Sequence, residues 1–105
     1  MARRYLVRTT RASEVDILEA RDYISSDSPR AALTWVEEIS RALESLGRFP
    51  HRGAVIPEAE DLGRELRHLV LGQYRLIYRL EGSTVWVLRV VHGARLLDMR
   101  ILGGQ

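Results

Sequence analysis

Residues 28–47 read SPRAALTWVEEISRALESLG, and this stretch decides the fold. Pro29 suits the first turn of a helix, Ser28 can cap that turn, and Gly47 follows the last apolar position. Between these ends apolar side chains recur at the spacing of one helical face, at Ala32, Trp35, Val36, Ile39, Leu43 and Leu46. We therefore expect a long amphipathic helix that buries this face against another layer.

The residues before this helix predict a second helix and a short strand. Thr9-Thr10 offers an N-cap, and helical spacing continues through Ile17, Ala20 and Ile24, which predicts a helix over about residues 11–25. Because the linker Ser25–Pro29 is short, the two helices should form an antiparallel hairpin. Arg4–Arg8 alternates in polarity and predicts an opening strand.

The second half of the chain predicts strands. Residues 49–61 read as a long loop, and strand-like runs follow at about Glu65–Leu71, Tyr74–Leu80 and Thr84–His92. Tight turns separate the runs, so they should form an antiparallel meander. The expected fold is α+β, a single domain over residues 1–105 in the order β-α-α-β-β-β, with a partly flexible tail at about 97–105.

Composition excludes several kinds of chemistry. The chain has 105 residues and no cysteine, so disulfides, thiolate metal sites and cysteine nucleophiles are absent. No apolar run approaches the ~18 residues that a membrane span needs. No phosphate-binding glycine loop or metal-ligand spacing is present. We expect a cytoplasmic protein without a metal or cofactor.

The charges are distributed unevenly along the chain. All 16 basic residues are arginine, and each guanidinium is a planar donor suited to phosphate or carboxylate. Residues 12–47 hold three arginines against eight acidic residues, whereas residues 63–105 hold seven arginines against three. The basic second half favours an anionic partner.

Strand alternation assigns some of these arginines to one face of the sheet. It places Arg67, Arg75, Arg79 and Arg89 together around Ile77 and Val87, with Leu66, His68, Tyr78 and Leu88 on the face toward the helices. Such a half-apolar, basic face could bind an anionic or amphipathic partner. Alternatively, these are ordinary solvated strand residues, some of them paired with Glu65 or Glu81, and a β-bulge would break the assignment.

The three histidines show no metal-ligand spacing. His51 falls in the loop, and His68 is expected to be packed in the core. His92 ends the last predicted strand close to Arg95, where a general base could sit. No partner acid or nucleophile can be assigned to it, so a structural role stays open.

Five pieces of the sequence, taken in order, resemble the ParE/RelE toxin superfamily over about residues 4–98. They are Ala20-Arg-Asp-Tyr-Ile24, Ser28-Pro-Arg-Ala-Ala32, Leu46-Gly-Arg-Phe-Pro-His-Arg-Gly53, Gly72-Gln-Tyr-Arg-Leu-Ile-Tyr-Arg79 and Val87-Leu-Arg-Val-Val-His-Gly-Ala-Arg95. Each piece is weak alone, and their joint order and spacing carry the resemblance. The resemblance implies a toxin encoded beside a small antitoxin, ParD-like or of another class, that wraps it in a hetero-oligomer. An acidic amphipathic antitoxin segment could cover the arginine face.

The resemblance also implies one of two targets. ParE-like members poison DNA gyrase, whereas RelE-like members cleave mRNA on the ribosome with clustered basic residues. Arg75 matches a catalytic arginine of RelE, but Leu66 and His68 stand where RelE carries lysines, and no tyrosine follows Tyr78. In an RNase, Arg75, His92 and Arg95 would act in catalysis.

The helical hairpin and the His92-Gly-Ala-Arg95 ending look more like ParE, which favours a gyrase poison without catalytic residues. On this interpretation the partner-binding residues are Arg67, Arg75, Ile77, Arg79, Arg89 and Arg95.

Overall fold

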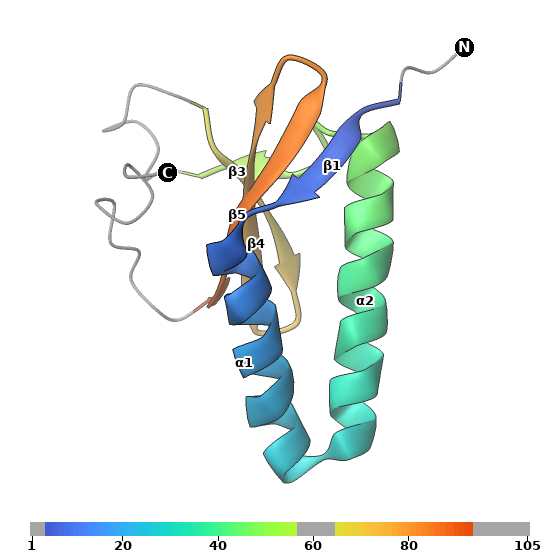
Figure 1. Cartoon of the computed structure of the whole chain (residues 1–105), viewed down its shortest axis with the longest axis vertical. Helices are drawn as coiled ribbons and strands as arrows, with labels where there is room; N and C mark the ends of the chain where they lie inside the picture. The colour runs from blue at the N-terminus through green and yellow to red at the C-terminus, as the bar shows by residue number, and fades with distance from the viewer. Residues whose placement is uncertain (1–3, 57–64, 94–105) are drawn as a thin grey trace.

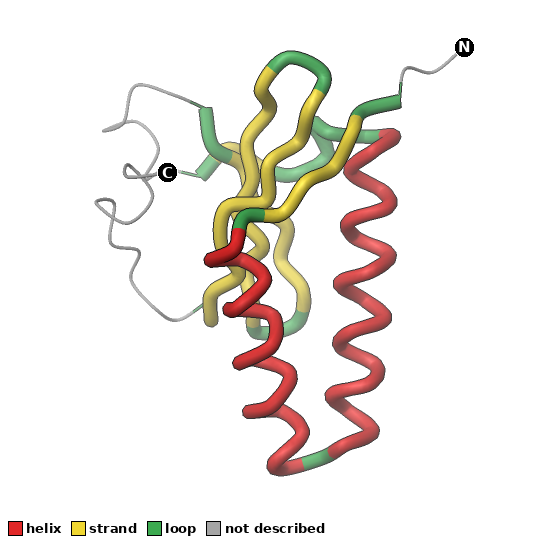
Figure 2. Tube along the Cα trace, in the orientation of Figure 1, coloured by secondary structure: helices red, strands yellow, loops and turns green. Residues whose placement is uncertain are grey.

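A computed structural model describes residues 4–56 and 65–93. Its elements are β1 (Leu6–Thr9), α1 (Arg11–Asp27), α2 (Pro29–Arg48), β2 (Ala54–Val55), β3 (Arg67–Leu71), β4 (Tyr74–Glu81) and β5 (Thr84–His92). The two helices form a hairpin on one side of a twisted sheet (Figures 1 and 2). This arrangement confirms the α+β prediction and the predicted order of the helices and main strands. Among the described residues no helix is long and apolar enough to cross a membrane.

The sheet has the strand order β1-β5-β4-β3-β2. β3, β4 and β5 form the predicted antiparallel meander, and both of its turns contain a glycine with positive φ, Gly72 at 63° and Gly82 at 60°. β1 pairs in parallel with β5, with Leu6 opposite Thr84 and Thr9 opposite Val87. β2 adds two residues to the outer edge of β3, inside the segment expected to be a loop.

Side-chain caps define where both helices begin. The hydroxyl of Thr10 accepts the Ser13 N–H at 3.1 Å, and the hydroxyl of Ser28 accepts the Ala31 N–H at 3.2 Å. Helix α1 continues to Asp27, two residues beyond the prediction. Helix α2 continues through Gly47, which was expected to end it.

Gly47 has a packing role instead. A Cβ at this position would lie 3.3 Å from the backbone oxygen of Tyr5, and its own carbonyl accepts the Tyr5 N–H at 2.8 Å. The absence of a side chain therefore lets the entry to β1 run against the end of α2.

Two apolar clusters lie on opposite faces of the sheet. The cluster toward the hairpin joins the buried face of α2 to the sheet through Trp35, Ile39, Ala42, Leu46, Leu69, Leu76, Tyr78, Val85, Val87 and Val90. The second cluster consists of Ile56, Leu66, Ile77, Leu88 and Val91, with Trp86 packed against it. Both faces of the central strands are therefore apolar, and only one of them meets the helices.

A β-bulge corrects the predicted facing of β5. Ile77 pairs with Arg89 and Tyr78 pairs with Val87, so Leu88 is an extra residue in β5. The bulge changes the alternation along the strand. As a result Val87 faces the hairpin and Leu88 lies in the opposite cluster, the reverse of the prediction.

Candidate functional site

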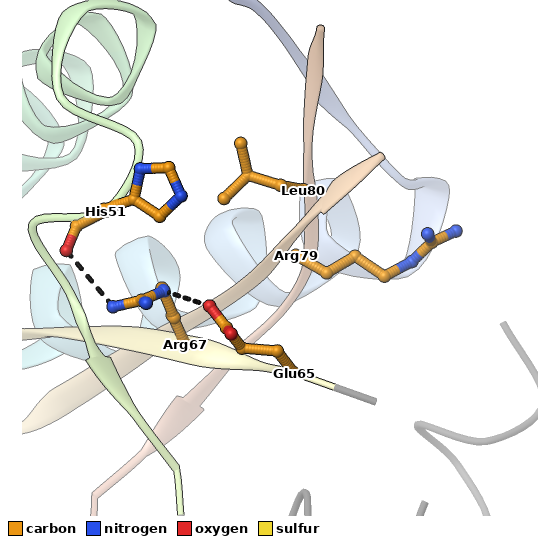
Figure 3. Close-up of a pocket in the computed structure, with 5 residues that line it drawn as sticks. All are labelled: His51, Glu65, Arg67, Arg79 and Leu80. Atoms are coloured by element: carbon orange, nitrogen blue, oxygen red, sulfur yellow. Dashed lines mark hydrogen bonds and ion pairs between the residues drawn. The ribbon is translucent and has the colours of Figure 1, made fainter. Parts of the chain in front are cut away.

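Arg67 holds the loop between α2 and β2 to the sheet. Its Nη1 donates to the backbone oxygens of Gly53 at 2.7 Å and His51 at 3.2 Å, and its Nε donates to Glu65 at 2.7 Å. Arg67 also lines a pocket of about 260 Å³ together with His51, Glu65, Arg79 and Leu80 (Figure 3). In Figure 3 the guanidinium of Arg79 points away from that of Arg67.

Arg75 lies on the sheet face opposite the hairpin, where it contacts His68. Its Nε donates to the Nδ1 of His68 at 2.9 Å. The pairing of His68 with Ile77 puts the imidazole on the same face, so the expectation that His68 packs toward the helices is wrong. Because Nδ1 accepts this hydrogen bond, a neutral His68 carries its proton on Nε2.

Arg79 and Arg89 form ion pairs within the chain. Arg79 pairs with Glu81. Arg89 makes a bidentate pair with Asp16 on α1, at 2.7 Å from Nε to Oδ2 and 2.9 Å from Nη2 to Oδ1. The side chain of Arg89 is 17% exposed and that of Asp16 is 11% exposed. The hydrogen bond to Asp16 raises the pKa of Arg89. Asp16 Oδ2 also accepts the Val90 N–H at 2.9 Å.

The predicted convergence of four arginines on one face is therefore wrong. Arg67 pairs in register with Tyr78 and points toward the hairpin side, whereas Arg75 lies on the other face. The alternative, in which strand arginines pair with Glu65 or Glu81, is confirmed for Arg67 and Arg79. Ile77 is fully buried at 0% exposure and adds no accessible surface. Arg95 lies outside the described residues.

His92 and Arg75 face opposite sides of the sheet. His92 pairs in register with Tyr74 on the hairpin side. The centroids of the two rings lie 5.5 Å apart in an edge-to-face arrangement. Arg75 pairs with Val91, which belongs to the opposite cluster. The structure does not bring together the two described members of the predicted RNase set.

Tyr78 and Asp16 make structural contacts that the sequence analysis missed. The Tyr78 hydroxyl donates to the Pro50 oxygen at 2.7 Å and accepts the Gly53 N–H at 3.0 Å. In the sequence Asp16 is one of the eight acidic residues of residues 12–47, and nothing distinguished it from the others. It sits three residues after the buried Ser13 and four before the buried Ala20, a helical spacing that could have placed it on the inner face.

A helical hairpin on one face of a five-stranded sheet is the α+β arrangement that the resemblance to the ParE/RelE toxin superfamily implied. The chain belongs to the ParE toxin family of type II toxin–antitoxin systems: the family described as "ParE toxin of type II toxin-antitoxin system, parDE" matches residues 7–97.

Relatives from both branches of the superfamily are similar to this chain. Toxin RelE2 of Caulobacter vibrioides is 35% identical over 81 residues, which cover 77% of this chain and 86% of that protein. Among solved structures, the toxin–antitoxin complex RelBE2 from Mycobacterium tuberculosis contains a chain with a TM-score of 0.56 and 30% identity, covering 85% of this chain and 98% of that one. The chromosomal ParDE system from P. aeruginosa contains one with a TM-score of 0.64 and 22% identity, covering 84% and 95%, a likeness of fold.

Proposed function

We propose that the chain arrests growth by binding DNA gyrase in the cytoplasm, and that a cognate antitoxin neutralises it in a hetero-oligomer. One observation favours a toxin that acts by binding over a toxin that acts as an enzyme. The candidate base His92 and the candidate phosphate-binding residue Arg75 lie on opposite faces of the sheet.

RNA cleavage needs both groups on one side. A base must take the proton from a 2′-hydroxyl while a cation stabilises the charge that develops on the phosphate. Arg75 on β4 and His92 on β5 point to opposite faces of the sheet, so the two side chains do not meet at one phosphodiester. The guanidiniums of Arg67, Arg79 and Arg89 hold carboxylates of this chain, so they serve the fold.

The alternative is a ribosome-dependent mRNA endonuclease, and one contact favours it. His68 and Arg75 touch at 2.9 Å on the same face, and the relative with 35% identity is named as a RelE toxin. In this contact Nδ1 of His68 accepts a hydrogen bond from Arg75, which occupies the lone pair that a base would use. The contact therefore supports binding of an anion better than removal of a proton.

The test uses purified toxin, gyrase and supercoiled plasmid. The proposal expects linear DNA to accumulate after protein denaturation, in proportion to added toxin, because a poison traps the cleaved complex. Induced cells are examined in parallel for mRNA cleavage at the ribosomal A site. No effect on gyrase at a large molar excess would reject the proposal. A-site cleavage that disappears in Arg75→Ala would establish the alternative.

A further inference from the structure

Two adjoining hollows lie where the hairpin meets the ends of the sheet strands. One, of about 380 Å³, lies between α2 and the β3–β4 turn and is lined by Ile24, Ala31, Thr34, Trp35, Glu38, Gly72, Gln73 and Tyr74. The other, of about 330 Å³, lies between α1 and the end of β5 and includes Glu19, Tyr23, Tyr74 and His92. Tyr74 lines both. We call the pair the aromatic groove and define it by Glu19, Tyr23, Trp35, Glu38 and Tyr74.

The floor and one wall of the aromatic groove are aromatic. Trp35 is 6% exposed and packs its ring 5.2 Å from that of Tyr74, and its indole Nε1 has no acceptor among the described residues. Tyr23 is 74% exposed on α1, although its ring is large and mostly apolar. Rings of this kind, one at the base and one exposed at the rim, are the side chains that anchor protein interfaces.

The charge of the aromatic groove is negative. Glu19 and Glu38 line it, together with Asp16, and no arginine does so among the described residues. Arg89 interacts with Glu19, which lines the groove, but its guanidinium is already paired with Asp16. A partner that seats here must bring positive charge, and a cation placed over the face of a tyrosine gains further attraction.

We propose that the aromatic groove binds a segment of the antitoxin in which a lysine or arginine stands beside an apolar residue. The apolar side chain packs on Trp35 and Tyr74, and the cation lies over the tyrosine faces near Glu19 and Glu38. This inference rests on the antitoxin partner of the proposed function and does not depend on the toxin's target. In this proposal a basic residue of the antitoxin binds on the hairpin side of the toxin. The sequence had instead predicted that an acidic antitoxin segment binds the strand arginines.

The experiment measures binding of the whole antitoxin encoded beside the toxin to the whole toxin by surface plasmon resonance. Glu38→Arg reverses one groove charge. Glu44→Arg is the matched control, because this exposed residue lies on the same helix six positions farther on and lines neither hollow. We expect Glu38→Arg to raise the dissociation constant about tenfold at low salt, with the difference shrinking at high salt, and the control to change it less than about twofold. Thermal melting establishes that both variants fold.

A second measurement locates the contact. Hydrogen exchange on the wild-type complex should show new protection at the amides of Gln73 and Tyr74. Reversing the contacting lysine or arginine of the antitoxin to glutamate should restore affinity for Glu38→Arg. Equal affinity losses in the variant and its control would overturn the proposal. So would lost growth arrest with unchanged antitoxin affinity, which would assign the groove to the toxin's target. Gyrase is absent from these binding measurements, so a negative gyrase result leaves the inference standing.

Discussion

Replacing Tyr78 by phenylalanine removes one hydroxyl from the interior and tests how the long loop is held. Tyr78 is 0% exposed, and its hydroxyl makes hydrogen bonds to Pro50 at 2.7 Å and Gly53 at 3.0 Å. Both partner residues are themselves buried. Phenylalanine fills the same space apart from the oxygen, so the substitution leaves a backbone carbonyl and a backbone N–H without the Tyr78 hydroxyl as partner.

The expected loss of stability follows from those two groups. An unsatisfied buried polar group costs about 1–3 kcal/mol, and relaxation of the loop reduces the sum, so we expect a loss of about 3 kcal/mol. A domain of this size has a free energy of unfolding of roughly 5–15 kcal/mol. A loss of 1 kcal/mol in the free energy of unfolding lowers the melting temperature by about 4 °C or more in a domain of this size. The melting temperature of the variant should therefore fall by about 10 °C or more.

Thermal and urea unfolding followed by circular dichroism measure this loss. Tyr23→Phe is the control, because that residue is 74% exposed and the same change should move the melting temperature by less than about 2 °C. If Tyr78→Phe melts within 2 °C of the wild type, the hydroxyl does not hold the loop and the reasoning is refuted.

The same hydroxyl predicts a dependence on alkaline pH. Burial raises the pKa of Tyr78 above its ordinary value of 10.0, although the Gly53 hydrogen bond partly offsets this. The folded state favours the neutral phenol of Tyr78. The contribution of this hydroxyl to folding stability is therefore complete below pH 10 and is lost as the pH rises through the pKa of the folded state. The difference in stability between the wild type and Tyr78→Phe should therefore narrow above pH 10. The pKa of Tyr74 is also raised by burial, and that contribution remains in both proteins.

Asp16→Asn removes the charge that Arg89 pairs with and should cost about 2 kcal/mol in urea unfolding; a double-mutant cycle with Arg89→Ala that shows no coupling would contradict the bidentate pair. Gly53→Ala should lower stability by more than about 3 kcal/mol or prevent folding, because its Cβ would lie 2.5 Å from a backbone oxygen of β3. Gly82→Ala has open space around it but a φ of 60°, so thermal melting should show a loss of only about 1 kcal/mol. Equal losses at the two glycines would show that the crowding at Gly53 is absent.

Local signals predicted the helices and the main strands well. Thr10 and Ser28 cap the helices because their hydroxyls need only reach an N–H three residues away. The turns at Gly72 and Gly82 follow from a backbone conformation that glycine adopts freely. In each case the physical cause lies within a few residues of its effect.

The candidate site was predicted less well because it depends on which face of the sheet meets the helices. Alternation groups residues within one strand, but Leu76 and Ile77 are both buried on opposite faces, so polarity alone does not say which face the hairpin covers. The bulge at Leu88 then reversed the phase of β5. The partner of Arg89, Asp16, is 73 residues away in the sequence. A local sequence pattern cannot predict a contact between residues so far apart.

The parallel pairing of β1 with β5 has a consequence for how the toxin is made. Leu6–Thr9 are synthesised well before residues 84–87, with which they pair. At about 5–20 residues per second, these partners are synthesised roughly 4–16 s after β1. β1 therefore joins the sheet only after residues 84–87 have been synthesised. A toxin cut short before Thr84 lacks β5, the strand that joins β1 to β4, so an incomplete product cannot place β1 in the sheet.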